Sequence, residues 1–571
     1  MYDLVIKNGK IVDGSGEASF IGDIAINGDR IVKIGLIEDK GNKEIDAEGN
    51  LVTPGWVDIH THYDGQVCWD EYLTPSCWHG VTTVVMGNCG VGFAPVKPGT
   101  EEFLVQLMEG VEDIPGVALN EGVSWDWESF PEYLDSIGKK NYAMDIGAMI
   151  GHGPIRSYVM GMDRCQGKEE ASDDEINEMA KITKEAIEAG ALGFSTSRTY
   201  LHRDKFGEYV PGTEATAKEM RKIANTIADL GQGTLEIVSD WMDQDIELDW
   251  VKEFVEKSDR TLTYAQTGGN PVETWKYCEE NFSKGVKIRP QFPGRPTGML
   301  FSLESTVHPF IAHPSYAEIA EKTLEEKVAT MKDKSFRQKI LSEEPAVDKN
   351  HMIYTLMMSF DKQFPMNEIP DYEPSYEESI AGIAESSGKS VMEVMYDEML
   401  KNEGKTFVWA PFSPYPDHNL DTYKMMMEFE SSVAGLSDGG AHCGLICDAS
   451  MPTWNVAHYT RDRVKGEKIP LEFLIRKQTK ETAETFGLMD RGQIKEGYLA
   501  DINIIDHENL CVYKPEMVHD LPTGSRRIIQ KAGGYIATIK SGVVTFKNDQ
   551  ATGELPGTVL RGERTAEAIS A

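Results

Sequence analysis

The chain has 571 residues, of which 40% are hydrophobic and 26% charged, as expected for a large folded protein with more than one domain. Its net charge of -36 argues against nucleic acid or an anionic membrane as its partner. No apolar run approaches the roughly 20 residues that a membrane span needs, and no signal peptide is visible, so we expect a cytoplasmic protein. Eight irregularly spaced cysteines favour free thiols.

Both ends of the chain have the pattern of short strands joined by tight turns. Asn8-Gly9 and Asn27-Gly28 each lie between short apolar runs, and Ser541-Gly542 does so near the other end. An Asn-Gly pair between alternating apolar runs is a strong hairpin signal. We therefore predict that residues 1–53 and 491–571 pair into one small β domain.

Between these ends, strand-like and helix-like segments alternate. One helix is well marked, because Ser172 and Glu175 form a capping box before an amphipathic run that stops at Gly190. Alternating β and α units imply a parallel sheet, and eight strands predict a (β/α)8 TIM-like barrel over residues 54–490. The eight expected strands are 56–59, 81–86, 144–150, 191–195, 234–238, 261–265, 286–289 and 433–436.

The alternation breaks between about residues 295 and 430. Helical pieces are joined there by Pro-rich connectors. Because this span leaves the barrel after the seventh strand and returns before the eighth, we predict a long insertion near the barrel mouth. Two interpretations stay open, a lid that contacts substrate and a surface excursion without a role in the site.

His60-Thr61-His62 directly follows the first predicted barrel strand. Alternate residues on a strand point to the same side, so both imidazoles can hold one metal ion while Thr61 points away. The plain alternative is a pair of surface histidines on a loop. A second motif after the last predicted strand, Ser437-Asp438-Gly439-Gly440, favours the metal site. On its own, Asp438 would be interpreted as a helix N-cap or a turn residue.

Together these motifs resemble the amidohydrolase superfamily, which has His-x-His after the first barrel strand and Asp after the last. The chain resembles in particular the D-aminoacylase (N-acyl-D-amino-acid deacylase) branch. The likeness covers nearly the whole chain and is weak over 295–430. It implies that the two chain ends form a composite β-sandwich beside the barrel. The segments that carry it are 54–63, 79–90, 151–153, 193–197, 437–439 and 497–501.

The resemblance also implies a divalent metal, usually zinc in that family, which polarises the scissile carbonyl and lowers the pKa of a bound water toward about 7. His60 and His62 would bind one metal and Cys89 a second. Asp438 would be both a metal ligand and the general base that passes a proton to the leaving amine. Cys89, in a Gly-Asn-Cys-Gly turn, has packing as its alternative role.

Two positions depart from the family. Where it has histidines after the fifth and sixth strands, this chain has Ser239 or Asp240, and Gln266. Neutral serine and glutamine are weak zinc ligands. Of one or two metals per chain we therefore favour one, on the His-x-His pair and the strand-eight aspartate. His152 and His202 lie near other predicted strand ends and have three open roles: substitute ligand, hydrogen-bonded loop histidine or oxyanion donor.

A further departure concerns the substrate carboxylate. The family's arginine for this group lies about a dozen residues after the strand-eight aspartate, and residues 447–454 contain none. Tyr200 does match a family tyrosine that contacts substrate. Four arginines are candidate replacements, each with a structural role as the alternative: Arg198, Arg203, Arg289 and Arg295. The candidate substrate-binding set is His152, Arg198, Tyr200, His202, Gln266 and Arg289.

We predict a metal-dependent amidohydrolase that cleaves a C–N amide bond, in an N-acyl (D-)amino acid or a related small amide. One alternative is a hydrolase of a cyclic amide or lactone on the same fold. Another is a degenerate barrel that binds metal or ligand without turnover. The expected partner is a small-molecule substrate, with neither nucleic acid nor a membrane, and a homo-oligomer is compatible with the sequence.

Overall fold

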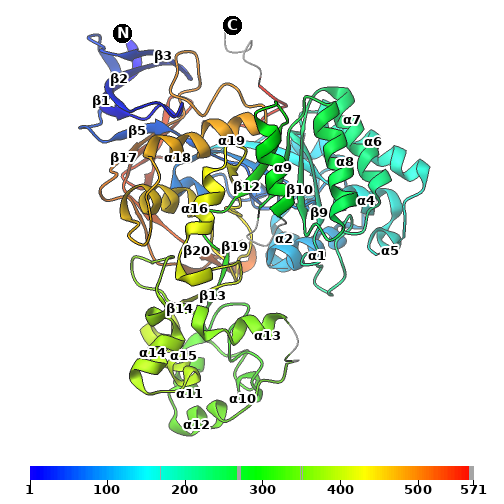
Figure 1. The fold of residues 1–571 in the computed structure, drawn as a ribbon, viewed down its shortest axis with the longest axis vertical. Helices are drawn as coiled ribbons and strands as arrows, with labels where there is room; N and C mark the ends of the chain where they lie inside the picture. Colours follow the sequence, from blue (N-terminus) through cyan, green and yellow to red (C-terminus); the bar gives the residue numbers. More distant parts are fainter. Residues whose placement is uncertain (168, 267–271, 348, 350–351, 565–571) are drawn as a thin grey trace.

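The computed structural model describes residues 1–564 except 168, 267–271, 348 and 350–351. Its centre is an eight-stranded sheet whose strands lie in the order β6-β7-β8-β9-β10-β11-β12-β16 and pair in parallel. Figure 1 labels β9, β10 and β12 of this sheet. Every strand predicted for the barrel is present. Their bounds are Trp56–Asp58, Val81–Met86, Asp145–Gly151, Gly193–Arg198, Thr234–Ser239, Leu262–Ala265, Ile288–Phe292 and Val433–Ala434.

Short contacts between the segments that follow β6 and β16 bring the first and last strands together. The His62 N–H donates to the Gly439 carbonyl at 2.8 Å, and the Asp438 N–H donates to the His60 carbonyl at 3.1 Å. Thr61 and Gly439 form a parallel bridge. The sheet is therefore a nearly closed barrel, and the two motifs are joined directly at its C-terminal end.

Helices cover the outer side of the barrel, which explains why the strands are apolar without alternation. All six residues of β7 and all seven of β8 are buried. The predicted capping box begins α6, where the Ser172 N–H donates to Glu175 Oε2 at 2.8 Å. The α-helices between β7 and β12 are α1 Glu101–Glu112, α2 Gly116–Gly122, α3 Phe130–Ile137, α4 His152–Met160, α5 Met162–Cys165, α6 Asp173–Glu188, α7 Ala217–Leu230, α8 Gln244–Lys257 and α9 Val272–Phe282.

Strands from both ends of the chain share a nine-stranded sheet. Its order is β24-β23-β22-β17-β5-β1-β2-β3, with β4 paired to β1. Strand β17 lies antiparallel to β5, with Ile504 opposite Val52. The sandwich packing and the domain limits stay predictions. The strands are Tyr2–Ile11, Phe20–Asn27, Arg30–Gly35, Gly41–Asp46 and Leu51–Pro54 for β1–β5, then β17 Ile502–Ile505, β22 Tyr535–Lys540, β23 Val543–Lys547 and β24 Gln550–Ala551.

Two two-stranded sheets and four further helices complete the fold. One sheet pairs β18 Cys511–Val512 with β21 Ala532–Gly533, and the other pairs β19 Glu516–Leu521 with β20 Ser525–Ile529. The helices are α16 Asp421–Glu428, α17 Met451–Ala457, α18 Leu471–Gln478 and α19 Lys480–Thr485.

The chain between β12 and α16 builds a separate helical unit on a small sheet of the order β13-β15-β14. Helices α10–α15 gather at the lower end of Figure 1, around a hydrophobic core of their own that includes Phe310, Met331 and Tyr396. The elements are β13 Gly298–Phe301, α10 Pro314–Ala317, α11 Leu324–Met331, α12 Lys334–Leu341, α13 Met352–Met357, β14 Phe364–Pro365, α14 Ile380–Ser387, α15 Val391–Met399 and β15 Val408–Pro411.

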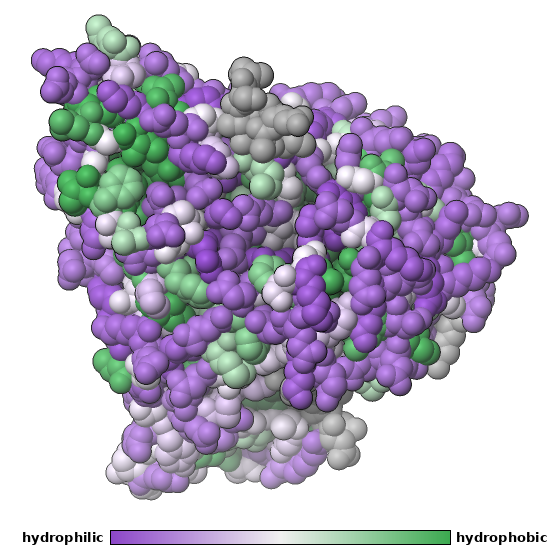
Figure 2. Space-filling view, turned by 45° about the horizontal axis from the view of Figure 1, so that its top comes forward, coloured by the Kyte–Doolittle hydropathy of each residue, from purple (hydrophilic) through white to green (hydrophobic). Residues whose placement is uncertain are grey.

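The surface agrees with the strongly acidic composition. Hydrophilic side chains cover most of the face shown in Figure 2. Among the described residues, no helix combines the length and apolar character that crossing a membrane requires.

Candidate metal centre

Four candidate ligands come together at the C-terminal ends of the barrel strands. His60 and His62 follow β6, Cys89 follows β7, and Asp438 follows β16. The donor atoms of His60, His62 and Cys89 all lie within 4.8 Å of one another. All three residues are buried. The (β/α)8 fold places its active sites at this end of the barrel.

The spacing of these donors fits one tetrahedral metal ion. Cys89 Sγ lies 3.4 Å from His60 Nε2, and Asp438 Oδ1 lies 3.6 Å from His60 Nε2 and 3.8 Å from His62 Nε2. Ligands bound to zinc at about 2.0–2.3 Å in a tetrahedron are themselves about 3.3–3.8 Å apart. Two imidazoles and a thiol are also a donor set that zinc prefers. The residues present therefore fit such an ion.

The backbone at two of these residues adopts a conformation that side chains rarely take. Cys89 has φ +57° and Asp438 has φ +49°, both in the left-handed region. Non-glycine residues held in this region tend to cluster at functional sites. Each turn directs its side chain inward from the end of a strand.

Burial dominates the electrostatics of the cluster. It lowers the pKa of His60 to about 4 and that of His62 well below its usual value, so both imidazoles are neutral and free to bind a cation. It raises the pKa of the Cys89 thiol, an effect to which Glu112 and Glu236 add. A bound divalent cation acts in the opposite direction and deprotonates a coordinating thiol.

Two buried carboxylates that the sequence analysis missed border the centre. Glu236, on β10, accepts the Cys89 N–H at 3.2 Å. Glu112, at the end of α1, has its Oε1 at 3.3 Å from His62 Nδ1. Each carried a signal in the sequence, because Glu236 interrupts an apolar strand and Glu112 lies on the apolar face of an amphipathic helix. Gln291 was also missed, and its Oε1 lies 2.9 Å from His60 Nδ1.

The residues at the ends of the fifth and sixth strands bond to the protein itself. Ser239 Oγ accepts the Trp241 N–H at 3.0 Å. Asp240 accepts from the Thr199 hydroxyl at 2.6 Å and from the Tyr200 N–H at 2.8 Å. Gln266 Oε1 accepts the Tyr264 hydroxyl at 3.0 Å. These contacts give none of the three positions the role of a family histidine.

The two other candidate histidines have different surroundings. His152 is fully buried, with Nε2 2.7 Å from Glu219 Oε1 and Nδ1 2.8 Å from Thr196 Oγ1, which is the pattern of a structural histidine. His202 Nδ1 lies 2.9 Å from Ser197 Oγ. Burial lowers the pKa of His202 to about 4, and its protonated form would disfavour protonation of His60 and His62, so it lies near the centre.

The candidate arginines bond to other groups of the protein. Arg198 pairs with Glu247 at 2.5 Å, Arg289 with Glu481 at 2.5 Å and Arg295 with Asp448 at 2.9 Å. The guanidinium of Arg203 lies 4.2 Å from the ring centre of Tyr209 and donates to the Gly207 carbonyl. Tyr200 is 39% exposed, and its ring packs edge-on against Tyr209.

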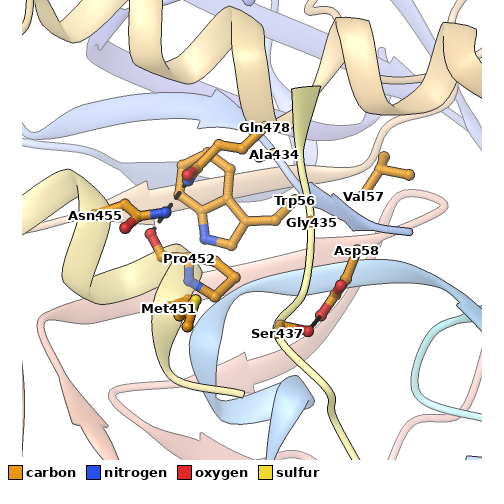
Figure 3. Close-up of a pocket in the computed structure, with 10 residues that line it drawn as sticks. All are labelled: Trp56, Val57, Asp58, Ala434, Gly435, Ser437, Met451, Pro452, Asn455 and Gln478. Carbon is orange, nitrogen blue, oxygen red and sulfur yellow. Dashed lines mark hydrogen bonds between the residues drawn. The ribbon is translucent and has the colours of Figure 1, made fainter. Parts of the chain in front are cut away.

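A small cavity marks the seam where the barrel closes (Figure 3). Its volume is about 20 Å³, so it is the size of a water molecule and too small for a substrate. The Ser437 hydroxyl donates to Asp58 across this seam, as the dashed line in Figure 3 shows. Ten residues line the cavity: Trp56, Val57, Asp58, Ala434, Gly435, Ser437, Met451, Pro452, Asn455 and Gln478.

The fold and this centre are those of a metal-dependent (β/α)8 hydrolase, and sequence comparison identifies the family. The chain belongs to the amidohydrolase family, whose sequence profile matches residues 43–546. A D-aminoacylase of Alcaligenes xylosoxydans xylosoxydans is 26% identical over 566 residues, which make up 98% of this chain and 97% of that protein. These matches confirm the family predicted from the motifs.

Solved structures share the fold over the full length. A D-aminoacylase studied for the functional role of its binuclear metal center aligns with a TM-score of 0.64 at 22% identity, over 99% of this chain and 100% of that one. An N-acyl-D-glutamate deacylase from Bordetella bronchiseptica, complexed with zinc and a phosphonate inhibitor, aligns with a TM-score of 0.62 at 19% identity. That alignment covers 98% of this chain and 99% of the deacylase.

Proposed function

We propose that the protein hydrolyses the C–N amide bond of an N-acylated amino acid, or of a related small amide, at one divalent metal ion. The observation that carries the proposal is the group of donors from His60, His62, Cys89 and Asp438 around one point. Three protein ligands with an open position are typical of catalytic zinc. We assign His60, His62 and Cys89 as those ligands, with Asp438 beside them. This differs from the sequence-based expectation, in which Cys89 binds a second ion and Asp438 completes the first site.

The bound cation would supply Lewis acidity, which activates a water molecule and polarises the scissile carbonyl. The chain's own contribution is proton transfer by Asp438. In the polypeptide alone, burial raises the pKa of Asp438 to about 8, with Asp448 and Asp58 adding to the effect. A neighbouring divalent cation favours the ionised form. Asp438 then accepts the proton of the attacking water and returns it to the leaving amine.

The relatives support an open-chain amide as the substrate. One full-length relative is a D-aminoacylase, and an N-acyl-D-aspartate deacylase of the same organism is 31% identical over 199 residues, or 35% of this chain and 37% of that protein. A panel should therefore contain N-acyl amino acids of both enantiomers, amides without a carboxylate, cyclic amides and lactones. Product amine and acid would be detected by mass spectrometry on the zinc-loaded protein.

The panel has outcomes that separate the candidate functions. Release of a free amine from an N-acyl amino acid supports the proposal, and His60→Ala should abolish that release. Turnover of only the cyclic amides or lactones would replace it with the alternative hydrolase. Zinc bound in stoichiometric amount with every substrate unaltered would make the barrel a binding protein.

We also propose that the insertion over 295–430 borders the entrance to this site. Its first strand, β13, contacts the loop after β16, where the Leu300 N–H donates to the Leu445 carbonyl at 2.8 Å. The Thr306 N–H donates to the Gly444 carbonyl at 3.0 Å. Since this loop includes Asp438, the insertion is well placed to position that residue.

A further inference from the structure

Two buried polar atoms lie close together behind the proposed metal centre. Glu112 Oε1 lies 3.3 Å from His62 Nδ1, and neither atom has a hydrogen-bond partner among the described residues. The Glu112 side chain is only 2% exposed and that of His62 only 1%. A buried carboxylate without a partner is costly, so such a pair calls for an explanation.

We infer that Glu112 is a positioning residue that orients His62 as a metal ligand, a role that rests on the metal centre of the proposed function. His62 Nε2 is the nitrogen on the side of the other donors, 3.8 Å from Asp438 Oδ1. A neutral imidazole that offers Nε2 to a cation carries its proton on Nδ1. Glu112 Oε1 is the acceptor beside that proton. A carboxylate in this place fixes the tautomer and makes the imidazole a stronger ligand.

The neighbouring ligand shows the same arrangement with a different partner. His60 presents Nε2 to Cys89 Sγ at 3.4 Å and has Nδ1 2.9 Å from Gln291 Oε1. Both histidines therefore turn Nε2 inward and Nδ1 toward an oxygen acceptor. The acceptor is a neutral amide for His60 and a carboxyl group for His62, so of these two acceptors Glu112 is the one that can place a negative charge next to a ligating imidazole.

The end of α1 is fixed to the loop that carries Asp438, which holds Glu112 in place. The His442 N–H donates to the Glu112 carbonyl, and the Gly444 N–H donates to Asp113 Oδ2 at 2.9 Å. The side chains of His62, Glu112, His442 and Asp438 also lie next to one another in a closed ring. His442 Nε2 lies 3.7 Å from Glu112 Oε2 and 3.9 Å from Asp438 Oδ2. Glu112 thus lies between a proposed ligand and the loop of the proposed base.

Zinc affinity of the full-length protein tests this inference without any substrate. The metal would be removed and the dissociation constant for zinc measured at pH 7.5 by competition with a chromogenic chelator. Glu112→Ala should weaken zinc binding about 10–100-fold, the range found for partners of ligating histidines. Glu112→Gln keeps the shape and an oxygen acceptor, as Gln291 does for His60, so its effect should be smaller. Glu109→Gln, on the same helix and partly exposed, should change the constant less than about twofold.

A second measurement separates positioning from general loss of structure. The visible spectrum of the cobalt-substituted protein reports ligand geometry, and it should change in both Glu112 variants while their circular dichroism stays that of wild type. In a His62→Ala background, Glu112→Ala should weaken binding little further, because the residue acts through His62.

Three results would overturn the inference. The first is a dissociation constant for zinc in Glu112→Ala that lies within about twofold of wild type, while His62→Ala binds zinc more weakly. The second is a fall in stoichiometry from two ions to one with the first constant unchanged, which would make Glu112 a ligand of another ion. The third is a wild-type protein that binds no zinc. If the protein binds zinc and hydrolyses no amide, the proposed function is rejected, and the inference that Glu112 orients His62 is unaffected.

Discussion

Replacing Asp438 by asparagine tests the assignment of the general base. Asp438 Oδ1 faces the Nε2 atoms of His60 and His62 at 3.6 and 3.8 Å, which is where the base must lie to reach an activated water. Asparagine keeps the size and one oxygen of the side chain and cannot take up the proton. Since general acid–base help is worth about 10²–10⁴-fold, kcat should fall at least about a hundredfold, equal to about 2.7 kcal/mol in the barrier.

The pH profile sharpens this test. The base works only when ionised, so kcat/KM of wild type should rise with pH along one ionisation. Burial raises the pKa of Asp438 to about 8 in the polypeptide alone, and a bound cation lowers it, so that limb should lie below pH 8 in the zinc-loaded enzyme. In Asp438→Asn the remaining activity should no longer rise with pH in this range.

The assay uses an N-acyl substrate identified by the panel, with zinc content and thermal unfolding measured on each sample. Asp229→Asn, at an exposed position on α7, is the control and should behave as wild type. Loss of zinc from Asp438→Asn would show that ligation contributes as well, and rates would then be compared at saturating metal. A variant that retains its zinc and turns over within about threefold of wild type would show that the proton goes elsewhere.

Three further predictions concern metal count, the insertion and stability. Elemental analysis should give one tightly bound metal per chain, lost in His60→Ala; two ions per chain, both retained in Cys89→Ala, would contradict this. Phe301 pairs with Val408 in antiparallel strands, so an Asn-Gly turn can replace residues 302–407. The shortened protein should keep a folded barrel and have a raised KM. Unchanged kinetics would show that the insertion has no role in the site. Burial raises the pKa of Asp145, but Lys540 and Arg491 outweigh it and bring the pKa to about 2. Because this lies below the unfolded value of 3.8, the stabilisation is complete above about pH 4 and is lost as pH falls toward 2. Asp145→Asn should lower the free energy of unfolding by about 3–5 kcal/mol at pH 7, because it removes a buried counter-charge of Arg491 and Lys540. Equal urea midpoints for variant and wild type would refute the role of this ion-pair cluster.

The sequence by itself determined the features that depend on neighbouring residues. The eight barrel strands follow from apolar runs of the right length, and the capping box at Ser172 follows from a spacing of three residues. His60 and His62 are two apart, so their common direction is a local property of an extended chain. The family likeness added Cys89 and Asp438, because their turns are contiguous motifs.

Tertiary structure decided which side chains meet across long separations in the chain. Gln291 is 231 residues from His60, and no periodicity links the two. Glu112 reaches His62 only because the end of α1 is bonded to the loop after β16. The arginines were candidates by residue type alone, and the fold supplies Arg198 and Arg289 with carboxylates that neutralise them. Partners of this kind depend on how separate elements pack in three dimensions, and local sequence pattern carries no record of that packing.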